Sequence, residues 1–271
     1  MTGGRDGHGG RWARAAAAAA GLLLTACATV PPDAGRNPRD PYERVNRQVS
    51  AFNDKFDRYL MKPLAKGYQA VVPRAFRTCI NNGFANLGEV RNAANDILQA
   101  KPGGVATDTG RLAINSTLGV AGCFDVATRM GFERRHEDFG LTLARWGAGT
   151  GPYVVLPFLG PSDVRDGIGL VPDFYSSPVG YVMPVSARFY LEGTGLVDTR
   201  AELLDATKLI EQVALDPYQF TRDAYLQRRL SLQYEGNPPL PKLEDDDSGE
   251  SGPGPDATKA KPAQPAQPDG R

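Results

Sequence analysis

The sequence has few of the residues on which enzymes and metal sites depend. Its 271 residues include two histidines, and because His8 lies in a segment expected to be removed, His136 is the one imidazole left. A zinc site usually takes about four ligands. Glu137 and Asp138 follow His136, but adjacent residues on a helix point in different directions. We interpret the three as a capping cluster at a helix start, and we expect no metal, no cofactor and no catalytic residue.

Other patterns that carry chemistry are missing too. Residues 160–163 lack the second glycine of a GxSxG nucleophile elbow. Gly147, Gly149 and Gly151 do not have the GxGxxG spacing, and no phosphate-loop lysine follows them. Basic and acidic residues both number 31, so no basic excess points to nucleic acid as a partner. Beyond residue 26, no apolar run approaches the roughly 20 residues of a spanning helix.

The N-terminus has the pattern of a lipoprotein signal. Residues 1–14 carry three arginines and one acid, residues 15–24 are apolar, and Leu24-Thr25-Ala26-Cys27 matches the lipobox. We expect cleavage before Cys27 and a diacylglyceryl group on its thiol; the alternative is an ordinary signal peptide with a cysteine there by chance. Ala28 favours the outer membrane, because an aspartate there would favour inner-membrane retention. Two or three acyl chains would make dissociation negligible.

Composition divides the chain into a signal peptide, residues 1–26, and three further parts. Residues 27–39, rich in proline, glycine and asparagine, are typical of a linker, here carrying the lipid. Because twelve residues reach at most about 40 Å, the following domain must lie near the headgroups. Residues 40–235 have the length of one domain. Residues 236–271 cannot form a core and are predicted to be a disordered acidic and proline-rich tail.

Helix starts are predicted where an N-cap acceptor precedes a proline or an apolar stripe. They fall at Asp40-Pro41, at Ser162 with Asp163 in the first turn, at Asp198, and at Asp216-Pro217. The last helix is expected to run through about residue 234.

The helix after residue 41 has an apolar stripe with a repeat of three and four residues. It consists of Tyr42, Val45, Val49, Phe52, Phe56, Tyr59 and Leu60. Such a stripe packs on a core or contacts lipid, and different parts of it can do each. A second stripe covers residues 76–98, where Gly83 and Gly88 favour a division into two helices. Weaker helical patterns cover residues 105–118 and 185–191.

Cys79 and Cys123 remain once Cys27 carries lipid. An exported protein meets oxidising conditions, so a disulfide between them is possible. Two buried free thiols are an equally good interpretation, because sequence gives no distance.

One segment is not helical. Gly147, Gly149 and Gly151 precede Pro152 and the apolar run 153–159. The pattern predicts a glycine-rich loop or hairpin with an extended segment, inside a mainly α domain. Glycine serves a functional hinge and a plain tight turn equally well, so both interpretations stay open.

Several runs between residues 40 and about 230 occur together in one order. They are DPYERVNR at 40–47, FN at 52–53 before the Pro63 break, RLAINSTLG at 111–119, FDVA at 124–127, EDFG at 137–140, WG at 146–147, GPYVVLP at 151–157, LGPS at 159–162, RD at 165–166, ELLD at 202–205 and DPY at 216–218. Together with the lipobox, they resemble the VacJ/MlaA family of lipoproteins.

The resemblance implies a ring-like amphipathic helical domain lying in the inner leaflet of the outer membrane, on its periplasmic face. Its channel would accept phospholipids mislocalised to the outer leaflet and pass them to a soluble periplasmic lipid carrier, with trimeric porins as further partners. The positions that match the family's channel and hinge are Gly147, Gly149, Gly151, Pro152, Tyr153, Phe52 and Asn53.

Three functions follow as hypotheses. A lipid-transfer channel is the one that the resemblance favours. An envelope scaffold would bind porins without moving lipid, and its preparations would not contain phospholipid. A lipid hydrolase would need His136 and Ser162, and its turnover would be lost when either is replaced.

Overall fold

The computed structural model describes residue 31 and residues 34–239. The predicted signal peptide, the lipidated Cys27 and the tail beyond residue 239 lie outside the described residues. The predicted class, mainly α with one glycine-rich hairpin, is confirmed. In chain order the elements are α2 (Glu43–Phe56), the π-helical turn η1 (Asp57–Met61), α3 (Lys62–Val71), α4 (Arg74–Leu98), α5 (Pro102–Thr117), α6 (Val126–Arg129), α7 (Phe139–Arg145), β1 (Tyr153–Leu156), β2 (Gly160–Asp163), α8 (Val164–Ser176), the 3-10 turn η2 (Pro178–Tyr181), α9 (Val185–Glu202), α10 (Leu204–Val213) and α11 (Pro217–Gln233).

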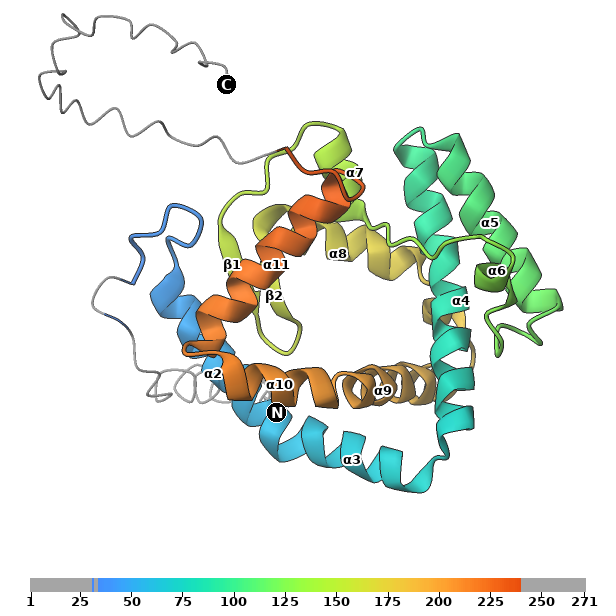
Figure 1. Ribbon diagram of the computed structural model, residues 1–271, viewed down its shortest axis with the longest axis horizontal. Helices are drawn as coiled ribbons and strands as arrows, with labels where there is room; N and C mark the ends of the chain where they lie inside the picture. The colour runs from blue at the N-terminus through green and yellow to red at the C-terminus, as the bar shows by residue number, and fades with distance from the viewer. Residues whose placement is uncertain (1–30, 32–33, 240–271) are drawn as a thin grey trace, which may run out of the picture. The chain divides into compact units, whose positions relative to one another are not determined.

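The elements contact one another in a closed circuit (Figure 1). α2 continues through η1 into α3, α3 lies beside α9, and α9 contacts α4. α4 in turn contacts α8, which touches both strands of the hairpin, and β1 lies on α2. α5 and α6 attach to the outer side of α4 (Figure 1). The hairpin thus joins the first described helix to later elements of the domain.

Burial is inverted relative to an ordinary soluble domain. Most buried side chains in the described part are polar or charged, and the largest fully buried one is Arg111. The two buried apolar clusters are small and centre on Ala65 with Ala201 and on Tyr153 with Tyr218. Large apolar side chains are widely exposed, with a dense group between residues 164 and 196: Val164, Ile168, Leu170, Val171, Phe174, Tyr175, Tyr181, Met183, Val185, Phe189, Tyr190, Leu191 and Leu196.

α4 is one helix instead of two, and it buries the face that the apolar pattern did not predict. Gly83 and Gly88 lie inside it without interrupting it. Phe76 and Leu98, at the ends of the apolar stripe, are exposed. A row of polar side chains three or four residues apart is buried instead: Asn86, Glu89, Asn92, Asn95, Asp96 and Gln99. Because each finds a hydrogen-bonding partner on a neighbouring segment, the polar face is the packing face.

Two aspartates that were predicted to cap helices, Asp40 and Asp198, do not cap them. α2 begins at Glu43, and Asp40 is completely buried, with a carboxylate that bonds to side chains from other elements. Asp198 lies inside α9, where it accepts hydrogen bonds from Tyr68 and Asn81. Both carboxylates bond to side chains brought close by the tertiary fold, and the local sequence does not reveal these partners.

Other helix boundaries differ less. Asp163, one residue after the predicted Ser162, caps α8 by accepting the backbone N–H of Asp166 at 2.8 Å. Pro63 does not break the chain's helical path, because it lies in the first turn of α3, where its missing N–H costs little. The cap at Asp216 is confirmed for α11.

Within the residues that the structure covers, no helix combines the length and apolarity needed to cross a bilayer. Cys79 of α4 and Cys123, in the loop after α5, are joined by a disulfide. It fastens the α5–α6 segment to α4 beside the hydrogen bond from the Asn82 amide to the carbonyl of Cys123, 3.0 Å long.

Candidate functional site

The hairpin is fastened to α2 by two asparagines two helical turns apart. The Asn46 side chain donates to the carbonyl of Tyr153 at 3.0 Å and accepts the N–H of Val155 at 2.9 Å. Asn53 repeats this arrangement with the carbonyl of Leu156 at 2.9 Å and the N–H of Phe158 at 2.8 Å. Each amide therefore bonds to the strand as a backbone neighbour would. Sequence reasoning identified Asn53 as a site residue and missed Asn46.

Aromatic side chains cover the tip of the hairpin. Phe158 lies edge-on to Phe52 and Phe56 of α2, with ring centroids 5.1 and 5.0 Å apart. Its own backbone has a φ of +66°, which is unusual outside glycine. The structure thus brings the predicted Phe52 and Asn53 to the hairpin, together with Tyr153.

A buried polar cluster lies beneath β1. Asp40 accepts hydrogen bonds from Asn46, from the hydroxyl of Tyr218 at 2.7 Å and from Arg222 at 3.3 Å. Burial raises the pKa of Tyr218, and its hydrogen bond to Asp40 raises it further. Tyr218 is therefore a neutral donor at physiological pH.

An ion-pair chain continues from this cluster. Arg47 contacts Glu43 at 2.8 Å and Asp216 at 2.7 Å, and its guanidinium lies over the ring of Tyr218. Burial alone would raise the pKa of Asp216, but the hydrogen bond and charge of Arg47, together with the backbone N–H groups of Gln219 and Tyr218, lower it. The N-cap of α11 is thereby tied to α2.

The hairpin separates two cavities of different character. Because successive strand residues face opposite sides, Tyr153 and Val155 line a cavity of about 380 Å³ whose wall includes Arg47 and Asp216. Val154 and Leu156 line a groove of about 660 Å³ on the other side. Apart from Asp163 and Gly167, the wall of that groove is apolar: Val154, Leu156, Val164, Ile168, Val171 and Pro172. A molecule with a polar head and apolar chains would find a matching surface on each side.

The three predicted glycines lie in the loop before β1 and do not all have the same need for glycine. Gly147 and Gly151 have φ values of +93° and +69°, where other residues are strained. Gly149 has no such φ, and a side chain there would meet open space. Pro152 follows at the entry to β1, where its carbonyl accepts the N–H of Val164 at 3.2 Å.

A second polar interface, between α4 and α5, escaped sequence reasoning. Arg111 is fully buried, with its Nε 2.7 Å from Glu89, and it also bonds to Thr128, the carbonyl of Phe132 and Asp125. The available signal was a polar repeat of three and four residues in both helices. In α5 the repeat consists of Gly104, Asp108, Arg111 and Asn115.

The side chains that sequence reasoning weighed for catalysis or metal binding make other contacts in the structure. The hydroxyl of Ser162 bonds to the carbonyl of Asp163 and not to an imidazole. Asp138 caps α7 through the N–H of Leu141 at 2.8 Å, in agreement with the capping interpretation. In the part of the chain that the structure describes, no three histidine, cysteine or acidic side chains converge as metal ligands would.

Fold and site together define a helical protein with a polar interior, an apolar exterior and a two-faced hairpin. Residues 38–232 match the model of the MlaA lipoprotein family. The chain belongs to this family.

Individual relatives agree with the assignment. The intermembrane phospholipid transport system lipoprotein MlaA of Escherichia coli (strain K12) is 35% identical over 237 residues, which cover 83% of this chain and 92% of that protein. An uncharacterized protein of Rickettsia bellii is 33% identical over 209 residues, covering 76% and 82%. A solved structure described as the structural basis for maintenance of bacterial outer membrane lipid asymmetry shares 32% identity with a TM-score of 0.60, covering 73% of this chain and 99% of that one.

Proposed function

We propose that this protein is a lipid-anchored component of intermembrane phospholipid transport at the periplasmic face of the outer membrane. It takes phospholipids mislocalised to the outer leaflet, lets them pass through an amphipathic passage within the circuit of helices, and releases them to a periplasmic carrier. This activity maintains the lipid asymmetry of the outer membrane. It breaks no bond and uses no cofactor.

The observation that carries the proposal is the hairpin with a charged cavity on one face and an apolar groove on the other. A phospholipid moving past Tyr153 and Leu156 keeps its polar headgroup on the side of the polar cavity while its chains stay against Ile168 and Val171. Because an unpaired charge in an apolar medium costs several kcal/mol, such a divided path lowers the barrier that a bare bilayer presents.

The exposed apolar side chains between residues 164 and 196 support placement in a leaflet. A helix with one apolar face lies in the interface without spanning the membrane. Acyl chains on Cys27 would hold the domain there. A Cys27→Ala variant should be held in the membrane fraction only weakly, through its exposed apolar side chains, and should fail to restore lipid asymmetry; firm retention with normal asymmetry would contradict the anchor.

The decisive experiment is mass spectrometry of lipids that co-purify with the detergent-extracted protein. Phospholipid should be bound, and Ile168→Asn, at an exposed position of the groove, should reduce it severalfold. Leu209→Asn, equally exposed on α10 but outside the groove, is the matched control. The alternative of a porin-binding scaffold predicts porin without bound lipid in both variants.

A further inference from the structure

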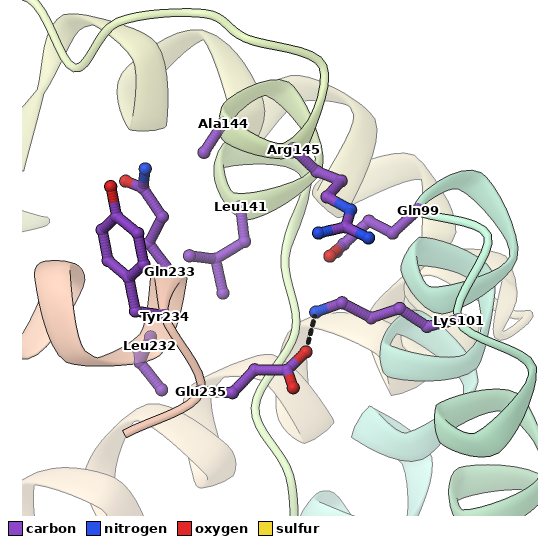
Figure 2. Close-up of a pocket in the computed structure, with 9 residues that line it drawn as sticks. All are labelled: Gln99, Lys101, Leu141, Ala144, Arg145, Leu232, Gln233, Tyr234 and Glu235. Carbon is purple, nitrogen blue, oxygen red and sulfur yellow. Dashed lines mark ion pairs between the residues drawn. The ribbon is translucent and has the colours of Figure 1, made fainter. Parts of the chain in front are cut away.

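A third cavity lies away from the hairpin, where the end of α11 meets α7 and the turn between α4 and α5. It measures about 570 Å³ (Figure 2). Lys101 and Arg145 extend toward it, and the amide of Gln99 and the ring of Tyr234 complete its wall (Figure 2). None of these residues belongs to the hairpin or to its two cavities.

The only carboxylate in the wall comes from Glu235. Its Oε1 lies 2.9 Å from the Nζ of Lys101 (Figure 2), although the Glu235 side chain is 62% exposed. The hydrogen bond from Lys101, with the charges of Lys101, Arg135 and Arg145, lowers the pKa of Glu235. Three cations therefore surround the place that this carboxylate occupies.

The backbone shows that glutamate is an unusual choice here. Helix α11 ends in a Schellman motif, in which the N–H of Gly236 bonds to the carbonyl of Ser231 at 2.8 Å and that of Glu235 bonds to Leu232 at 3.2 Å. Glu235 occupies the left-handed position of this motif, with a φ of +51°, where glycine is preferred. An exposed ion pair contributes little stability, so stability does not account for a strained glutamate.

Both Lys101 and its other carboxylate partner, Glu137, have further polar contacts besides each other. Lys101 also contacts Glu137 at 3.1 Å, and Glu137 separately receives Arg135 at 2.9 Å and the amide of Gln99 at 2.9 Å. The Lys101–Glu235 pair also stands between two cavities, because both residues line a neighbouring one of about 990 Å³ that includes Arg134 and Arg135. Withdrawal of the Glu235 side chain would leave Lys101 paired with Glu137 alone and would remove the one carboxylate that shares the cavity of about 570 Å³ with Lys101 and Arg145.

We propose that Lys101 and Arg145 form a binding site for a phosphate group, and that Glu235 is a built-in stand-in that the phosphate displaces. This inference rests on the proposed function in one respect: the phosphate of a phospholipid headgroup is its expected source, with free phosphate as the other.

The test is calorimetric titration of the full-length protein in detergent at low ionic strength, with inorganic phosphate and with a water-soluble, short-chain phosphatidylglycerol as separate probes. Glu235→Gln should raise affinity about fivefold, the factor that corresponds to removing one partly exposed competing ion pair. Lys101→Gln and Arg145→Gln should each weaken binding. Glu211→Gln, which removes the similarly exposed pair with Lys62 on α3, should change nothing.

Both probes binding, or the short-chain lipid alone, supports the site, and their ratio separates headgroup recognition from simple phosphate binding. Equal affinities in the wild-type, Glu235→Gln and Arg145→Gln proteins would overturn it. Arg145 is exposed, so its replacement should not disturb folding. Co-purifying phospholipid, measured on the same variants, tests the proposed transport function independently, because the hairpin cavities remain intact.

Discussion

At the scale of single residues, the interior is held together mainly by paired charges and only to a small extent by apolar side chains. The Arg111 side chain is fully buried, and the side chain of its partner Glu89 is 1% exposed. Replacing Arg111 by methionine keeps the volume nearly the same but leaves Glu89 buried without its cation. We expect a loss of about 3–5 kcal/mol in the free energy of unfolding, measured by urea denaturation.

The control is Lys62→Gln, which breaks the exposed pair with Glu211. That change should cost less than about 1 kcal/mol. Similar losses for Arg111→Met and Lys62→Gln would show that the buried pair is not what holds α5 to α4.

Asp108 gives the interior a dependence on pH. Burial, together with the negative charges of Asp96 and Glu89, raises the pKa of Asp108 to about 7, against the charge of Arg135. Among the residues that the structure describes, nothing donates a hydrogen bond to either Asp108 carboxylate oxygen. The Asp96 carboxylate lies against the backbone of Gly104, and a Cβ at that position would clash with it.

The folded protein therefore binds a proton on Asp108 more tightly than the unfolded chain does. Its contribution to stability is complete at low pH and is lost as pH rises through about 7. Between pH 5 and 8 we expect wild-type protein to lose roughly 2–3 kcal/mol from this group. In Asp108→Asn that slope should be nearly absent; an unchanged slope in urea titrations across this range would contradict the assignment.

At the scale of elements, the loop before β1 contains a glycine that its backbone conformation requires, Gly151, and one that it does not, Gly149. Gly151→Ala should cost about 1 kcal/mol, because its φ is +69° and an added Cβ would lie 3.2 Å from Val164. Gly149→Trp should leave thermal unfolding unchanged, since the position is open. If this loop moves during transport, Gly149→Trp should still raise outer-leaflet phospholipid in cells; normal levels would show that the loop is only a turn.

The elements themselves were largely predictable, and their packing was not. The cap at Asp216 and the glycine-rich hairpin follow from local chemistry, and both are found. The apolar stripe of α4 indicated a helix, but it does not mark the packing face, because the structure buries the opposite row around Glu89 and Asp96. The usual rule that apolar side chains pack inside fails here, where large apolar side chains are widely exposed.

The site shows the same division. Asn53 and Tyr153 were found through family resemblance, while Asn46 and Asp40 were not. Their partners, Tyr153 and Tyr218, lie more than one hundred residues away along the chain. The sequence alone does not show that an asparagine side chain makes the hydrogen bonds that a neighbouring strand would make.

At the scale of the whole molecule, buried charge and exposed apolar surface are two sides of one arrangement. If the exposed apolar side chains face lipid, as proposed, polar side chains gain nothing there and collect inside, where most of them are paired. The exposed aromatics of α9 are the clearest case, because Phe189 and Tyr190 are 63% and 77% exposed.

Replacing Phe189 and Tyr190 together by serine tests the orientation of that surface. In water the change should alter the free energy of unfolding by no more than about 0.5 kcal/mol per residue, as expected for exposed positions. Binding to vesicles of phosphatidylethanolamine and phosphatidylglycerol should weaken about a hundredfold, if each aromatic contributes about 1.5 kcal/mol on entering the leaflet. A Cys27→Ala background removes the acyl chains from the comparison, and Glu202→Ser, exposed on the same helix, is the matched control. Unchanged vesicle binding with a large loss of stability would show that protein, and not lipid, covers α9.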